Sequence, residues 1–228
     1  MKALAITILL AASVQAQASS YDPMIDAAAM RHGVDRIVLR AIAEHESRKH
    51  PWVFNADGEP FRFKDKNSTV QALWGLTQVP WMVKARPLQG KGSRRFFRSQ
   101  QAAQAYASRL ATMSGLKQRT DDRKEVDRGE IRVRKLRMKN TDLGIAQINY
   151  RWHDAGTASV QRWLDPAYNL DYAASYLAKL KREHGTDLIA VRFYHDKRSE
   201  FQKAYMADFM PKYEQEKRNA RISLAASR

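Results

Sequence analysis

The chain has 228 residues and a formal net charge of +16. It contains no cysteine, which excludes disulfide bonds, a lipidated cysteine and a cysteine nucleophile. Its length suits either one domain that carries an insertion or two small domains.

The first 18 residues have the pattern of a secretory signal peptide. Lys2 precedes an apolar run at residues 3–14, and Ala16-Gln17-Ala18 fits a small-residue cleavage site. That run is shorter than the ~20 residues that cross a bilayer, and no later stretch reaches this length. The sequence therefore predicts no transmembrane segment and an exported protein, periplasmic or extracellular, whose mature part begins near Ser19.

Two helices are predicted next in the chain. The first spans about Pro23 to Arg31, and four residues on its inner side are expected to be buried: Met24, Ala27, Ala28 and Met30. The second begins after Asp35, a favourable N-cap, and carries the apolar stripe Val38, Leu39 and Ile42.

Glu46 lies on the face of this second helix that is expected to be buried, seven residues after Leu39. Burial favours a neutral carboxyl group and raises its pKa, so Glu46 is a candidate general acid. The alternative is that the helix frays after Ile42 and leaves Glu46 in water.

A small β element is predicted after the second helix. Strand-like residues flank Ala56-Asp57-Gly58, which is a hairpin turn signal. The segment from Gln71 to Leu76 is ambiguous, and Pro80 and Pro87 limit any helix there. An amphipathic helix follows at Gln100 to Leu116, with its inner positions at Ala103, Tyr106, Ala107, Leu110 and Met113.

The segment from Met82 to Lys139 is strongly basic. It holds 17 Lys and Arg against 5 Asp and Glu, and it ends in a charged loop at 121–128 and a possible basic strand at 130–139. Such a segment indicates either an anionic partner or only a well-solvated surface.

Helices return towards the C-terminus. One is predicted from Asp165-Pro166 to Gly185, with an inner apolar stripe at Leu170, Ala173, Ala174, Leu177 and Leu180. A short one is predicted from an Asp187 cap to Tyr194, and a last one at 199–217 that buries Phe201, Tyr205 and Phe209. Residues 218–228 are expected to form a flexible basic tail. The predicted fold class is α+β and mainly α, with one small β-hairpin.

Four short motifs occur in a characteristic order: Glu46-Ser47 at a helix end, GIAQIN at 144–149, DPAYNLDYAASYL at 165–177 and RFYH at 192–195. In this order they resemble the lytic transglycosylases with a soluble-lytic-transglycosylase, goose-lysozyme-like domain. The resemblance implies a lysozyme-like helical domain at 19–217, interrupted by a basic insertion at about 82–139.

The resemblance also implies a role for each matching residue. Glu46 would be the sole catalytic acid and Ser47 its supporting neighbour. Gln147 and Asn149 would line the glycan cleft, Gly144 would let the chain pass close to the sugar, and Tyr194 would hydrogen-bond near the acid. Two departures from the family pattern are Arg48, where glycine is usual, and Ala146, where methionine is frequent.

The implied reaction needs one carboxyl group and no metal or cofactor. It would cleave the β-1,4 bond between N-acetylmuramic acid and N-acetylglucosamine and leave a 1,6-anhydro product. A second carboxylate, at Asp57 or Asp142, would instead favour hydrolysis. His45 and His50 stand five residues apart, whereas the zinc motif needs four, so a metalloprotease is not indicated.

Two other interpretations stay open. GLTQVP at 75–80 mimics the glutamine motif closer to Glu46, but the later Asn149, His153 and Asp165 follow only GIAQIN. The second alternative is that the chain is a basic module that binds a polyanion without catalysing a reaction. Nucleic acid would suit its charge, although a secretory signal argues against this partner. The implied partners are peptidoglycan glycan strands and the machinery of secretion, pili or conjugation.

Overall fold

The computed structural model describes residues 21–121, 123–153 and 158–226, so the predicted signal peptide at 1–18 lies outside it. The chain divides into two compact units. Unit 1 is drawn from Met1–Val53, Leu143–Ile148 and Gly156–Arg228, and unit 2 from Phe54–Asp142 and Asn149–Ala155. None of the helices formed by the described residues has the length and apolar character that a bilayer crossing needs.

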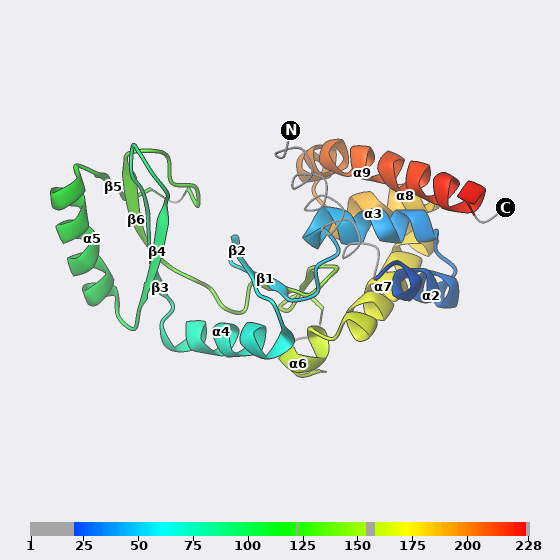
Figure 1. Ribbon diagram of the computed structural model, residues 1–228, viewed down its shortest axis with the longest axis horizontal. Helices are drawn as coiled ribbons and strands as arrows, with labels where there is room; N and C mark the ends of the chain where they lie inside the picture. The colour runs from blue at the N-terminus through cyan, green and yellow to red at the C-terminus, as the bar shows by residue number, and fades with distance from the viewer. Residues whose placement is uncertain (1–20, 122, 154–157, 227–228) are drawn as a thin grey trace, which may run out of the picture. The chain divides into compact units, whose positions relative to one another are not determined.

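The fold is α+β and mainly α, as predicted. Unit 1 is helical, and its longest helices, α7 and α9, pack against α2, α8 and α3 (Figure 1). Its helices are α2 (Asp22–His32), α3 (Arg36–Ser47), α6 (Val160–Trp163), α7 (Pro166–His184), α8 (Asp187–His195) and α9 (Ser199–Ala226). The predicted apolar stripes of α3 and α7 are buried.

Local capping explains where these helices begin. Asp35 caps α3 by accepting a hydrogen bond from the Ile37 amide, and Asp165 caps α7 ahead of Pro166. The predicted cap of α8 was wrong by one residue, because the Thr186 hydroxyl accepts from the Ile189 amide.

The predicted end of α9 was also wrong. This helix continues to Ala226, so residues 218–226 are helical rather than a loose tail. Three residues predicted to be buried are exposed: Met30 (80%), Met113 (84%) and Phe201 (42%). In the first helix the buried positions are instead Ile25, Ala28 and Ala29.

The predicted hairpin is formed by β1 (Val53–Ala56) and β2 (Glu59–Arg62), and all of it except Val53 belongs to unit 2. Asp57 and Gly58 have φ values of 52° and 88°, which the tight turn between these strands requires. The sheet has the order β2-β1-β7-β8, with β7 at Thr141–Leu143 and β8 at Ile148–Asn149. The ambiguous segment around Gln71 is helical, within α4 (Lys66–Gln78).

The basic segment folds as a second sheet covered by a helix on one face (Figure 1). Its strand order is β4-β3-β6-β5, with β3 antiparallel to β4 and β6, and β5 parallel to β6. The strands are β3 (Trp81–Arg86), β4 (Ser93–Phe97), β5 (Lys117–Arg119) and β6 (Glu130–Lys135), and the helix is α5 (Gln100–Ser114). Val83, Ala85 and Ile131 of the sheet pack against Ala103 and Ala107 of α5.

Candidate functional site

Glu46 lies in the last turn of α3, and its side chain is half-buried. The helix remains intact to Ser47, so it does not fray after Ile42. The Tyr205 hydroxyl donates a hydrogen bond of 2.6 Å to Oε1 of Glu46. The carboxyl group is therefore held at the end of the helix and is not free in solvent.

Tyr205 reaches Glu46 from α9, 159 residues along the chain. Its ring is buried, lies edge-on to His45 at 4.5 Å and stacks on His195 at 4.6 Å. Burial raises the pKa of Tyr205 well above its usual range, and the nearby Glu46 charge raises it further. The phenol thus stays protonated and acts as a hydrogen-bond donor. Periodicity predicted Tyr205 only as a core residue, and no local signal indicates this contact.

Ser47 connects the end of α3 to the GIAQIN segment. Its hydroxyl donates to the Ile145 carbonyl oxygen at 2.7 Å, and its oxygen accepts from the His50 amide at 3.0 Å. Ser47 is itself buried. The structure therefore gives Ser47 a supporting contact beneath the acid, and it places the hydroxyl against protein rather than on an open surface.

The GIAQIN segment makes a tight turn in unit 1. Gly144 and Gln147 have φ values of 75° and 47°, and the Gln147 side-chain amide donates to the Gly144 carbonyl oxygen at 2.8 Å. Asn169 of α7 holds the turn from beneath: its Oδ1 accepts from the Ala146 amide, and its Nδ2 donates to the carbonyl oxygens of Leu143 and Trp163. Asn169 was not predicted as a site residue.

The protein interior itself explains glycine at position 144. A Cβ atom there would lie 2.7 Å from Nδ2 of Asn169 and 3.0 Å from the Trp163 carbonyl oxygen. Neighbouring protein atoms occupy the space that a side chain would need, so packing and a positive φ both require glycine at this position.

Tyr194 of α8 approaches the same turn. Its hydroxyl donates to the Ala146 carbonyl oxygen at 3.0 Å, and Tyr194 lies close enough to Tyr205 to contribute to the raised pKa of that phenol. Unit 1 thus brings together five predicted site residues at the end of α3 and the adjoining turn: Glu46, Ser47, Gly144, Gln147 and Tyr194.

Asn149 belongs to unit 2 and is already bonded there. Its Nδ2 donates to Oδ1 of Asp142 at 2.7 Å and to the Asn140 side chain at 3.2 Å. Burial raises the pKa of Asp142, against the opposing effect of the Asn149 hydrogen bond. Within unit 2, Asn149 is therefore a partner of a buried carboxyl group.

Two alternatives from the sequence, the GLTQVP stretch at 75–80 and the carboxylate of Asp57, have structures unlike those of GIAQIN and Glu46. Gly75 to Gln78 of GLTQVP form the last turn of α4, with Gln78 exposed, so this stretch does not make the turn seen in GIAQIN. Burial alone would raise the pKa of Asp57, but hydrogen bonds from Arg137 and Asn140 hold it below its usual range. Asp57 is thus a fixed anion.

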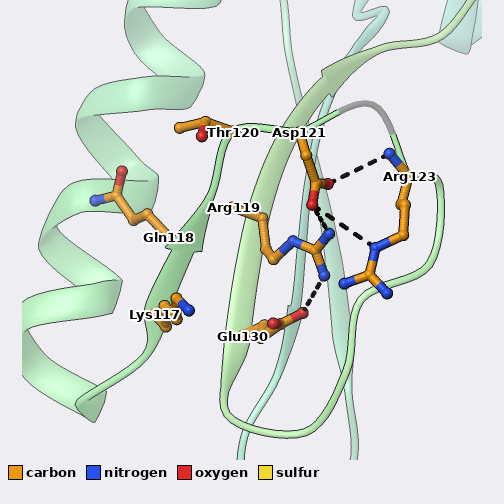
Figure 2. A pocket seen from close by; sticks show the side chains of 7 residues that line it. All are labelled: Lys117, Gln118, Arg119, Thr120, Asp121, Arg123 and Glu130. Carbon is orange, nitrogen blue, oxygen red and sulfur yellow. Dashed lines mark hydrogen bonds and ion pairs between the residues drawn. The ribbon is translucent and has the colours of Figure 1, made fainter.

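A cavity of about 260 Å³ lies in unit 2, and none of the predicted site residues lines it (Figure 2). Figure 2 shows the Arg119 guanidinium between the carboxylates of Asp121 and Glu130, with Arg123 also bonded to Asp121. Arg119, Asp121, Arg123 and Glu130 are therefore paired with one another at this cavity. Across the described residues, no group of three or more His, Asp or Glu side chains is arranged to hold a metal ion.

Comparisons of the chain with protein-family models, with curated proteins and with solved structures give no match.

Proposed function

We propose that the protein is a peptidoglycan lytic transglycosylase. The observation that carries the proposal is the half-buried Glu46 carboxyl group, held by the Tyr205 hydroxyl at 2.6 Å at the end of α3. Ser47, the next residue, is bonded to the glutamine-bearing turn, so the acid and that turn share one support. Motif order and this local geometry are independent, and both favour the same residue.

In the proposed reaction, Glu46 donates its proton to the oxygen between N-acetylmuramic acid and N-acetylglucosamine as the C1–O bond breaks. The muramoyl C6 hydroxyl then attacks C1 and returns a proton to Glu46, which closes the 1,6-anhydro ring. A positioned proton donor of this kind contributes about 10²–10⁴-fold in rate. Tyr205 keeps the carboxyl group in place through both steps, and Gln147 lies on the turn that would face the glycan.

The test is digestion of purified peptidoglycan, with the products analysed by mass spectrometry. We expect 1,6-anhydromuropeptides from the native protein and a loss of at least about 10²-fold for Glu46→Gln. Glu44→Gln is the matched control, because Glu44 is a half-buried glutamate on the same helix whose pKa is raised by burial, and it makes no contact with Tyr205 among the described interactions.

Each outcome of the digestion separates two functions. Reducing-end products would identify a hydrolytic lysozyme, and wall binding without products from any form would identify a non-catalytic module. Glu44→Gln and Glu46→Gln losing activity equally would show that charge on α3, rather than proton transfer, is responsible. We further propose export to the periplasm or cell exterior and a role in local wall remodelling, beside a secretion, pilus or conjugation apparatus.

A further inference from the structure

The basic excess of the chain lies mostly in unit 2, which holds 21 Lys and Arg against 10 Asp and Glu, whereas unit 1 holds 19 against 14. Some of the basic side chains of unit 2 form ion pairs within the unit. Two buried carboxylates of the hairpin, Asp57 and Glu59, pair with five cations: Lys84, Arg94, Lys124, Arg134 and Arg137. Because these five cations already pair with carboxylates of the protein, we expect an anionic partner to bind other cations.

A second group of cations lies on the face of the β4-β3-β6-β5 sheet that α5 covers. Trp81 of β3 stands directly across from Phe97 of β4 on one side and from Lys135 of β6 on the other. Tyr106 of α5 packs on Phe97 at 5.2 Å, and Arg95 lies two residues before Phe97. We call these five residues the aromatic–cationic strip.

In this strip each cation lies over an aromatic ring. The Arg95 guanidinium carbon is 4.9 Å from the Tyr106 ring centroid, and Lys135 Nζ is 5.9 Å from that of Trp81. Arg95 and Lys135 are exposed, and among the described residues no carboxylate pairs with either of them. A ring restrains a cation without cancelling its charge, which lowers the entropy cost of binding an anion there.

We propose that the aromatic–cationic strip docks the protein on the carboxylates of peptidoglycan, outside the site that carries Glu46. This inference rests on the proposed function for the choice of polymer, since the peptide stems of peptidoglycan bear carboxylates. A charged N–H group binds a carboxylate strongly through charge-assisted hydrogen bonds. Nucleic acid is disfavoured because Arg95 and Lys135 occupy the ring faces on which bases would stack.

The test measures binding of the full chain to purified sacculi by co-sedimentation. A Glu46→Gln background keeps the sacculi intact. Arg95→Gln with Lys135→Gln is compared with a control pair in unit 1, Arg36→Gln with Lys179→Gln, which removes the same charge from exposed residues already paired with acids. Each protein is also measured on sacculi whose carboxylates have been amidated and on double-stranded DNA, and circular dichroism checks folding.

We expect about fivefold to tenfold weaker binding for the strip pair and less than about twofold for the control pair. Amidation of the sacculi should weaken binding of the protein with the unaltered strip to a similar extent, and added salt should also weaken this binding. Equal losses for the two pairs, or binding that survives amidation, would overturn the proposal. Retention of DNA binding that depends on Arg95 and Lys135, without dependence on wall carboxylates, would assign the strip to nucleic acid instead.

A second measurement, on short soluble glycan fragments, tests the proposed enzymatic activity independently of wall docking. With Glu46 present, the strip pair should cleave these at the native rate, because docking is not required for a fragment that diffuses to the site. Cleavage with strip-independent wall binding would remove the docking proposal alone. Strip-dependent wall binding with no cleavage by any form would remove the enzymatic proposal alone.

Discussion

The carboxylates in two regions of this molecule accept hydrogen bonds from different kinds of donor. In unit 2, Asp57 and Glu59 are bonded by guanidinium and ammonium groups, with Arg134 reaching both. In unit 1, Glu46 accepts a hydrogen bond from the uncharged phenol of Tyr205. Cations hold a carboxylate in its anionic form, whereas a phenol fixes its position and adds no positive charge. The difference separates acids that stabilise the fold from one suited to transfer a proton.

The largest expected effect comes from removing an acid of the cationic kind. Asp57→Asn keeps a residue type that tolerates the positive φ of 52° but removes the ion pairs with Lys124, Arg134 and Arg137, of which only Arg134 retains a second anion, Glu59. We expect the free energy of unfolding to fall by about 3 kcal/mol, as when one partner of a buried pair is removed. Urea unfolding at neutral pH measures this loss.

Asp65→Asn is the control, since Asp65 is an exposed N-cap of α4 and asparagine caps equally well. The pH dependence gives a second check. The folded pKa of Asp57 is lowered, so its stabilisation is complete above the unfolded pKa of about 3.9 and is lost as the pH falls through the lower folded pKa. A variant that kept the native acid-denaturation curve would contradict the role given to Asp57.

The next effect concerns the turn beside Glu46. Gly144→Ala places a methyl group 2.7 Å from Asn169 at a positive φ, and we expect a loss of about 3 kcal/mol in the free energy of unfolding. Gly33→Ala is matched in φ, at 65°, but no atom lies within 4 Å of its Cβ, so strain alone should cost about 1 kcal/mol. Equal losses in urea unfolding would show that Asn169 does not crowd the turn.

Sequence patterns predicted the local parts of this arrangement and missed the distant ones. The Asp35 cap, the apolar stripe of α3 and the hairpin turn at Asp57-Gly58 are encoded within a few residues, and all three are present. The contact from Tyr205 to Glu46 depends on how α9 packs against α3, which no short pattern reports. The same limit applies to Asn169, whose polar side chain is buried within a helix predicted from its apolar stripe.

The residues that were wrongly predicted to be buried have a related explanation. Met30 and Met113 match the helical period of the inner face, yet each lies near the C-terminal end of its helix and is exposed. Periodicity gives the direction in which a side chain points, but burial needs a neighbouring element on that side. At a helix end this neighbour is often absent, so the sequence pattern overestimates the core there.

A smaller effect tests the uncharged donor directly. Tyr205→Phe keeps the ring between His45 and His195 but removes the hydrogen bond to Glu46. A hydrogen bond to a charged group contributes about 1.5–3 kcal/mol, so we expect kcat/KM on glycan to fall by about 10- to 100-fold. Because the lost donor favoured the carboxylate, the pKa of Glu46 should rise, and the alkaline limb of the pH–rate profile, where the general acid loses its proton, should move to higher pH.

Tyr194→Phe serves as the control for this change. It removes a hydrogen bond to a neutral carbonyl oxygen, that of Ala146, and should lower kcat/KM by no more than about fivefold without moving the profile. If both variants shift the profile equally, Tyr205 has no special relation to the acid.

The smallest effect concerns the end of the helix that carries Glu46. Arg48 has a φ of 55°, and an L residue in this conformation costs about 1–2 kcal/mol. Arg48→Gly removes that cost but gives the unfolded chain more freedom, so we expect a net gain of about 0.5 kcal/mol in the free energy of unfolding. Thermal and urea unfolding, fitted together, resolve a change of this size.

Lys49→Gly is the contrasting variant, because Lys49 has nearly the same φ of 53° but is buried between Asp22 and Glu216, each at 2.7 Å. Its loss removes the cation from buried Glu216 and leaves Asp22 with Arg40, and it should cost about 3 kcal/mol despite the same relief of backbone strain. If Arg48→Gly raises the free energy of unfolding and Lys49→Gly lowers it, the ion pairs of Lys49 anchor the end of α3. Stabilisation by both would mean that backbone conformation alone governs the end of this helix.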